Sequence, residues 1–246
     1  MGCCVQLHRR IPVALLGERG IALAPVRVVC LDGAVEILAY CATAIIAYLL
    51  GSIPTGFLVA QAKGIDIRSV GSGNIGATNV LRAAGKPAAI FVLLFDGLKG
   101  YAACEWLAEL MLNLLIDKSA ELEVLKIIGG GCVILGHNYT CWLKFKGGKG
   151  IATSAGVLAA LVPWALLISL AIWIVVFTLT RYVSLASIAA SSSLPFATWL
   201  TGGSVTLIVV TAAMTALAIY KHKSNIQRLL SGTESRFGSR NKEATS

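Results

Sequence analysis

Residues 151–180 read IATSAGVLAALVPWALLISLAIWIVVFTLT, an apolar run interrupted only by Pro163. A helix needs about 20 residues to cross the hydrocarbon core of a bilayer, so this run is longer than one crossing requires. One tilted span would put Arg181 and the basic segment 221–228 on the face of the membrane opposite Lys149. A reversal near Pro163 puts both on the face that carries Lys149, as the positive-inside rule favours. We therefore predict a helical hairpin here.

The composition of the whole chain agrees with a membrane protein. Of the 246 residues, 57% are hydrophobic and 13% are charged, whereas soluble domains average about 25% charged. Lysine and arginine outnumber aspartate and glutamate 21 to 12, and this excess lies in short connectors between apolar runs. That distribution follows the positive-inside rule and argues against a nucleic-acid partner. Seven cysteines in no repeated spacing read as small buried side chains, with no metal site and no cofactor implied.

Other apolar runs supply the remaining predicted spans, at 35–62, 87–116, 124–143, 183–200 and 205–220. Together with the hairpin they predict an all-α, polytopic membrane protein of about seven transmembrane helices, each of spanning length. Pro54, flanked by nearby glycines, predicts a break near the end of the first span. The C-terminus then lies on the cytoplasmic side with the basic, glycine-rich loops, and the acidic connector 117–123 lies outside.

The domain organisation follows from where the spans begin. We expect residues 34–246 to form one transmembrane domain that includes a short cytoplasmic tail, and residues 1–33 to be an extension of unknown role. The extension carries several arginines, such as Arg9 and Arg10. An outward-facing N-terminus conflicts with these charges, because the positive-inside rule would keep them in the cytoplasm.

The glycine loop, residues 71–76, reads GSGNIG and matches the dinucleotide-binding pattern G-x-G-x-x-G. That pattern requires a preceding strand in a strand-helix-strand unit, whereas a membrane helix precedes it here. Glycines can also turn backbone amides toward an anion at a helix N-terminus, so a phosphate cradle is the better interpretation. A flexible cytoplasmic turn is the alternative. The candidate binding residues are Ser72, Gly73, Asn74, Thr78 and Asn79, and Arg82 is the candidate cation for phosphate.

The glycine turn, residues 147–150, reads GGKG and precedes an apolar helix with Thr153 in its first turn. It fails the Walker pattern, which would require glycine at Leu143 and serine or threonine at Gly150. The Lys149 ammonium and nearby amides could hold phosphate oxygens, with Gly147, Gly148, Gly150 and Thr153 around them. A snorkelling lysine that anchors the helix is the alternative.

Two further segments add polar side chains at the same membrane level. His222 and Asn225 are three residues apart on the last helix and so share a face. A histidine that merely complements the helix dipole is the alternative for His222. Ser187 is a candidate supporting donor near Arg181. His137 reads as an interfacial anchor rather than a site residue.

These segments, in this order, resemble the bacterial acyl-phosphate:glycerol-3-phosphate acyltransferases, the PlsY family. The resemblance runs from about residue 34 to 238 and includes Asp96, Lys99, Arg181 to Ile188 and Lys221 to Glu234. It departs from the family in the N-terminal extension and at Tyr139-Thr140, where a phenylalanine-proline pair is common.

The resemblance implies a seven-helix inner-membrane enzyme whose active site faces the cytoplasm. It implies acyl transfer from acyl phosphate to glycerol-3-phosphate, giving lysophosphatidate and inorganic phosphate in phospholipid synthesis. Ser72, Arg82, Thr78 and the glycines would bind the substrates, and Lys149, His222 and Asn225 would complete the site. We also expect membrane lipid as a partner, functional coupling to the enzyme that makes acyl phosphate, and a monomer.

Two rival functions predict other features. Thioester-using acyltransferases often carry a histidine followed five positions later by aspartate, but Val13, Trp142 and Gln227 stand at those positions. A transporter of phosphorylated solutes also uses basic, glycine-rich loops at broken helices. We find no evident inverted repeat, which disfavours transport. Direct transfer without an acyl-enzyme is the expected mechanism.

Overall fold

The computed structural model describes residues 26–115 and 122–238, and every long element in these ranges is an α-helix. The helices are α1 (Val26–Ser52), α2 (Thr55–Gln61), α3 (Ala77–Ala84), α4 (Lys86–Cys104), α5 (Trp106–Leu115), α6 (Leu122–Asn138), α7 (Ile151–Leu161), α8 (Pro163–Thr180), α9 (Val183–Leu200), α10 (Val205–Lys221) and α11 (Lys223–Leu230). Residues 1–25 of the predicted extension lie outside the described residues. The remainder of that extension from Val26 onward is helical and continuous with the first span.

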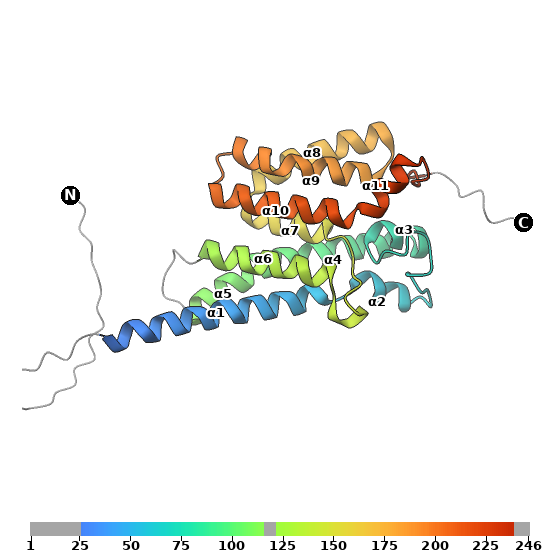
Figure 1. The fold of residues 1–246 in the computed structure, drawn as a ribbon. Coiled ribbons are helices and arrows are strands. Elements are labelled where there is room, and N and C mark those ends of the chain that lie inside the picture. The colour runs from blue at the N-terminus through green and yellow to red at the C-terminus, as the bar shows by residue number, and fades with distance from the viewer. Residues whose placement is uncertain (1–25, 116–121, 239–246) are drawn as a thin grey trace, which may run out of the picture.

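The helices form two layers with α7 between them (Figure 1). One layer contains α1, α4, α5 and α6, and the other contains α8, α9 and α10. The short helices α2, α3 and α11 gather at one end of the bundle, where the loop after α6 also lies (Figure 1). The predicted all-helical class is confirmed, and this end is where most predicted site residues meet.

The chain reverses where the sequence predicted it. Val162 leaves helical geometry with φ −143° and ψ 63°, and Pro163 begins α8 at a position where its missing N–H costs nothing. The backbone N–H of Phe237 donates to the carbonyl of Arg181 at 2.8 Å, so the end of α8 lies beside the C-terminal segment. Lys149, just before α7, contacts Asn225 on α11. Both ends of the 151–180 run therefore lie at the same end of the bundle, and the predicted hairpin is confirmed.

Other predicted boundaries agree in part. The predicted span at 183–200 coincides with α9, and the break at Pro54 separates α1 from α2. The predicted span at 87–116 consists of α4 and α5, joined at Glu105. The span predicted to reach Leu143 was too long, because α6 ends at Asn138 and residues 139–150 form a loop.

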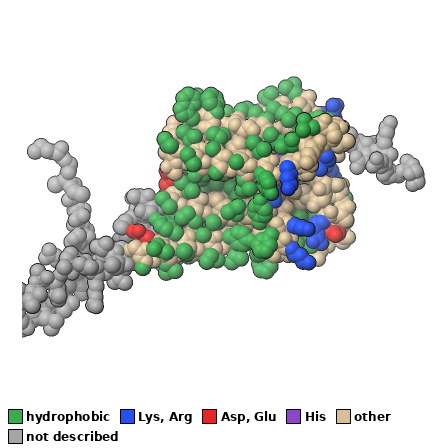
Figure 2. All heavy atoms as spheres, viewed as in Figure 1, with side chains coloured by type: hydrophobic (Ala, Val, Ile, Leu, Met, Phe, Trp, Pro, Cys, Tyr) green, Lys and Arg blue, Asp and Glu red, His purple; other side chains and the backbone are tan. Residues whose placement is uncertain are grey.

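Within the described residues, 4 helical stretches are long and apolar enough to cross a membrane, or 5 if α10 and α11, bent by 58°, form one span. The predicted count of seven spans stays a prediction. Apolar side chains are spread widely over the face of the bundle seen in Figure 2. Leu179 and Val205 are more than three-quarters exposed. This exposure is typical of lipid-facing surfaces.

Glycines let α6 approach α1 closely, and α4 approach α7. A Cβ at Gly136 would lie 2.1 Å from the carbonyl of Tyr48 on α1, and one at Gly100 would lie 2.1 Å from the carbonyl of Thr153 on α7. Membrane helices use small residues in this way because backbone contact replaces the hydrophobic driving force available in water. The contact between α4 and α7 fixes the direction in which α7 leaves the glycine turn.

Candidate active site

The glycine loop is organised from inside by one side chain of α3. The Asn79 amide nitrogen donates to the carbonyls of Ile67 at 3.1 Å and Val70 at 2.9 Å, and its oxygen accepts from the Ser72 N–H at 3.0 Å. Asn79 is 2% exposed. The predicted ligand Asn79 is thus directed toward the loop backbone, where it sets the loop's shape.

Some of the other residues in and after the loop set its backbone conformation, and others leave their hydroxyl groups without a protein partner. Gly71 and Gly73 have φ of +60° and +66°, a conformation that glycine adopts without strain. The Asn74 side chain accepts from the Gly76 N–H at 2.9 Å, which closes a local turn. The hydroxyls of Ser72 and Thr78 make no hydrogen bond to any described residue. Ser72 is exposed, so these hydroxyls can bind a ligand.

Arg82 stands at the end of α3 and is exposed, without a hydrogen-bond or ion-pair partner among the described residues. Its charge is near enough to Lys149 to contribute to lowering the pKa of that lysine. Arg82, which follows the glycine loop, and Lys149, in the glycine turn, therefore contribute positive charge to the same part of the molecule.

The glycine turn lies directly against the C-terminal end of α6. The N–H groups of Gly147 and Gly148 donate to the carbonyls of Asn138 at 3.2 Å and His137 at 3.0 Å. A Cβ at Gly148 would lie 2.1 Å from Nε2 of His137. These glycines are needed because no side chain fits between the turn and α6. Their amides are bonded to the protein backbone, and the expected contact of this turn with phosphate oxygens stays a prediction.

Gly150 and Thr153 complete this segment. Gly150 has φ +77° and leads into α7. Thr153, one turn into the helix, is fully buried, and its hydroxyl has no partner among the described residues.

Lys149 is half-buried and donates a hydrogen bond to the side-chain oxygen of Asn225. Burial, together with the nearby charges of Arg228, Arg82 and Lys221, lowers the pKa of Lys149 to about 8 against the opposing attraction of Glu234. A cation surrounded by other cations is a suitable partner for a multiply charged anion.

Glu234 holds this cluster together, and sequence analysis did not select it. Its carboxylate accepts from Ser184 at 2.6 Å, from the Asn225 amide at 2.7 Å and from Nε of Arg228 at 2.7 Å. Burial opposes ionisation of Glu234, but these three donors keep its pKa below the usual range. Glu234 fixes Asn225 in the orientation that receives Lys149.

His222 lies at the bend between α10 and α11 and is 3% exposed. Burial lowers its pKa to about 4, aided by the charge of Lys149, so the ring is neutral near pH 7. Nδ1 lies 2.8 Å from the carbonyl of Ala218 and donates to it, which leaves Nε2 as an acceptor.

Ser187 is separated from this cluster by its hydrogen bonds. Its hydroxyl donates to the carbonyl of Val183 at 2.8 Å and accepts from Nε1 of Trp173 at 3.2 Å. The hydroxyl that joins the cluster belongs to Ser184, one helical turn earlier. Among the described residues, no three histidine, cysteine or acidic side chains converge as metal ligands would.

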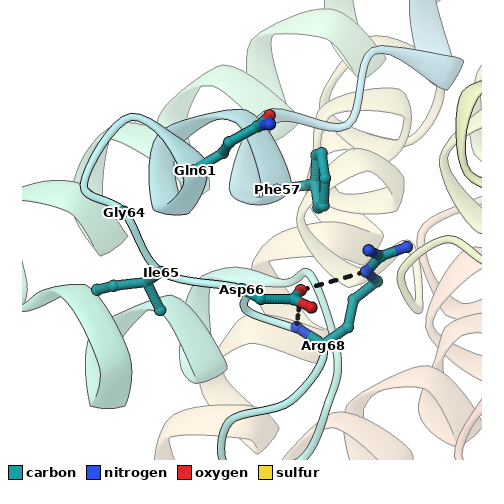
Figure 3. Close-up of a pocket in the computed structure, with 6 residues that line it drawn as sticks. All are labelled: Phe57, Gln61, Gly64, Ile65, Asp66 and Arg68. Atoms are coloured by element: carbon teal, nitrogen blue, oxygen red, sulfur yellow. Dashed lines mark hydrogen bonds and ion pairs between the residues drawn. The ribbon is translucent and has the colours of Figure 1, made fainter.

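A shallow cavity of about 320 Å³ lies beside the glycine loop (Figure 3). It is lined by Phe57, Gln61, Gly64, Ile65, Asp66 and Arg68. Nε of Arg68 is 3.3 Å from Asp66, and the guanidinium lies over the ring of Phe57. None of the predicted site residues lines this cavity, and its cation is already paired.

Charge divides the two ends of the bundle. Lysine and arginine side chains cluster at the end with α2, α3 and α11, whereas acidic side chains occur at the opposite end, with one more beside the basic group (Figure 2). The candidate site lies at the basic end, where an anionic substrate would be attracted.

Known proteins resemble this chain in sequence and in fold. Residues 41–232 match the model of the glycerol-3-phosphate acyltransferase family. The glycerol-3-phosphate acyltransferases of Geotalea daltonii and Desulforudis audaxviator are both 45% identical to the chain, over 78% and 79% of it and 94% of each relative.

Two solved structures of PlsY, described as an integral membrane glycerol 3-phosphate acyltransferase, also match. The glycerol 3-phosphate form has a TM-score of 0.73 and 42% identity, covering 81% of this chain and 96% of that one. The lysophosphatidic acid form has a TM-score of 0.70 and 41% identity, covering 81% and 95%. The chain belongs to the glycerol-3-phosphate acyltransferase family, the PlsY family.

Proposed function

We propose that this protein acylates glycerol-3-phosphate with an acyl phosphate donor, giving lysophosphatidate and inorganic phosphate. One observation supports the proposal most directly: two cations, Arg82 and Lys149, lie near each other at the basic end of the bundle. Arg82 is exposed and has no partner among the described residues, and Lys149 is half-buried. Both substrates carry phosphate, and two cations on separate segments allow two anions to be bound together.

Glycerol-3-phosphate binds at the glycine loop in this proposal. Arg82 is the bidentate partner of its phosphate, and the unpartnered hydroxyls of Ser72 and Thr78 supply hydrogen bonds. Asn79 keeps the loop in the required shape through its three backbone contacts.

The donor phosphate binds at Lys149. The hydroxyl of glycerol-3-phosphate attacks the acyl carbonyl carbon, a new ester bond forms, and the bond from that carbon to the phosphate oxygen breaks. Phosphate leaves with the bonding electron pair, and the Lys149 ammonium stabilises the charge that develops on it. The hydroxyl proton moves to a phosphate oxygen. Because the hydroxyl attacks the acyl carbon directly, no acyl-enzyme and no cofactor enter the reaction.

His222 orients the attacking hydroxyl. Its low pKa makes it a weak base, but Nε2 of the neutral ring can accept a hydrogen bond from the hydroxyl group. Such placement of reacting groups accounts for much of the rate when the leaving group is good.

The charge distribution supports a cytoplasmic active site in a bacterial inner membrane, because the positive-inside rule places the basic end there. The donor reaches that face from the enzyme that makes acyl phosphate, and the site is complete within one chain, consistent with a monomer. Nothing in this scheme requires nucleic acid.

The test is lysophosphatidate formation from labelled glycerol-3-phosphate by purified protein, with palmitoyl phosphate and palmitoyl-CoA in parallel. We expect product from palmitoyl phosphate alone, and a loss of about a hundredfold or more in Arg82→Ala. Product only from the CoA ester would overturn the donor assignment. Uptake of glycerol-3-phosphate into vesicles without product would instead indicate a transporter.

A further inference from the structure

A buried ion pair lies in the middle of α4, outside the site described above. Nζ of Lys99 is 2.8 Å from Oδ1 of Asp96, and each residue is 2% exposed. Charges inside a membrane span cost free energy even when paired, and an apolar pair of similar volume is often as stable. The pair therefore calls for an explanation other than stability.

The pair first connects α4 to the break between α1 and α2. Nζ of Lys99 donates to the carbonyl of Ile53 at 3.0 Å, and the hydroxyl of Thr55 donates to Oδ1 of Asp96 at 3.1 Å. These contacts lie on either side of Pro54, where the broken helix leaves a carbonyl without a helical partner. One ion pair thus fixes the chain direction into α2.

The pair also faces His137 at the end of α6. Nδ1 of His137 is 3.6 Å from Oδ1 of Asp96, and the ring is 5% exposed. The opposite ring nitrogen, Nε2, lies where a Cβ of Gly148 would be. Nδ1 makes no hydrogen bond to any described residue, so the imidazole is packed, rather than bonded, between the Asp96 carboxylate and the backbone of the glycine turn.

We propose that Asp96 and Lys99 are positioning residues, which act through His137 to hold the glycine turn and hence Lys149. The amides of Gly147 and Gly148 donate to the backbone carbonyls of Asn138 and His137, so the end of α6 supports the backbone of the turn. Lys149 follows Gly148 directly, and a displacement of about 1 Å at a binding group can reduce rate a hundredfold. The link from this pair to catalysis rests on the proposed function.

The test uses Asp96→Asn combined with Lys99→Met, which removes both charges while keeping the volume. The matched control is Glu105→Gln, which alters another carboxylate-lysine pair, Glu105 with Lys126 at 2.7 Å, beyond the end of α4. Thermal unfolding establishes that each variant is folded. If the double variant does not fold, Thr55→Val, which removes a single hydrogen bond to Asp96, replaces it.

Hydrogen–deuterium exchange over residues 143–150 tests positioning without reference to activity. We expect exchange to be about tenfold faster in the double variant, or about threefold faster in Thr55→Val, and unchanged in Glu105→Gln. Unchanged exchange in a folded double variant would overturn the inference. Because this readout needs no substrate, it separates failure of the inference from failure of the proposed function.

A double-mutant cycle then tests the link to Lys149. We expect kcat/KM to fall about tenfold to a hundredfold in the double variant, and the same change to have little further effect once Lys149→Met is present. In an Arg82→Lys background the loss should remain in full. An equal loss in both backgrounds would mean that the pair only stabilises the fold.

Discussion

The glycine loop and the glycine turn have similar compositions, but their glycines meet different requirements. In the loop, Gly71 and Gly73 adopt positive φ. In the turn, Gly147 and Gly148 have ordinary φ values but no room for a side chain, with a Cβ 2.1 Å from an atom of His137 in each case. Gly71 and Gly73 thus supply positive φ, as Gly150 also does at the end of the turn, whereas Gly147 and Gly148 supply small volume.

The cations of the two segments differ in the same way. Arg82 is exposed and has no hydrogen-bond or ion-pair partner among the described residues. Lys149 is half-buried, bonded to Asn225, and loses its charge near pH 8. One segment presents an open anion site and the other a tightly organised one, so the two should respond differently to mutation.

Replacing Lys149 should have the largest effect. Lys149→Met removes the cation proposed to stabilise the leaving phosphate, so we expect kcat to fall roughly 100- to 1,000-fold. Lys146→Met, at an exposed lysine just before the turn, is the matched control and should keep most of the activity. Comparable losses in both variants would show that general positive charge matters, rather than the organised site.

Alanine at the two kinds of glycine should distinguish volume from backbone freedom. Gly148→Ala forces a methyl group against His137, and we expect it to destabilise folding by about 1–3 kcal/mol. Gly73→Ala meets the Arg68 carbonyl at 3.0 Å and should cost about 1 kcal/mol, mainly from positive φ. Thermal and denaturant unfolding measure both. A larger cost for Gly73→Ala would reverse the comparison.

The pH dependence of the activity should report the ionisation of Lys149. Because the Lys149 cation is lost above about pH 8, kcat/KM should fall roughly tenfold for each pH unit above that value. Between pH 8 and the usual lysine pKa the unfolded chain binds the extra proton, so this group makes the unfolding free energy rise with pH in that window.

Two comparisons sharpen the pH test. Lys149→Arg should move the alkaline fall of its remaining activity above the wild-type value, since arginine stays charged. His222, with a pKa of about 4, should give no acid limb near pH 6.5. An acid limb there that disappears in His222→Gln would contradict its neutral state.

The smallest effect on stability is expected at Thr153. Its hydroxyl is buried without a partner among the described residues, so Thr153→Val should leave stability within about 1 kcal/mol or improve it. A loss of activity in this stable variant would then come from a missing contact to substrate. Unchanged kcat and KM would remove Thr153 from the predicted binding residues.

Much of the fold could be predicted because residues close to a helix end in the sequence often determine where that helix ends. Pro54 and Pro163 interrupt apolar runs, and a proline disrupts the helix that precedes it. The reversal near Pro163 also followed from charge, since only a hairpin placed Arg181 with the other basic residues. The end of α6 was missed because residues 139–143 are apolar enough to resemble a continuing span.

The site could be predicted less completely because contacts between distant segments leave no local pattern. Glu234 is joined to Ser184 across fifty residues, and Asn79 has a polar side chain whose partners are backbone groups. Asp96 and Lys99 did carry a signal, because two charged residues in an apolar span are a functional indication by themselves. His137 was set aside as an anchor, since its partners lie on α4 and in the glycine turn.

The bend at His222, between α10 and α11, has a consequence for the synthesis of the protein. Lys149 remains without its hydrogen-bond partner Asn225 until α11 has been synthesised, and Glu234, which fixes Asn225, is added later still. A chain interrupted after Tyr220 would contain the full set of apolar helices and could insert into the bilayer. It would nevertheless lack the cluster around Glu234, so membrane insertion and competence for catalysis are separate events in the life of this chain.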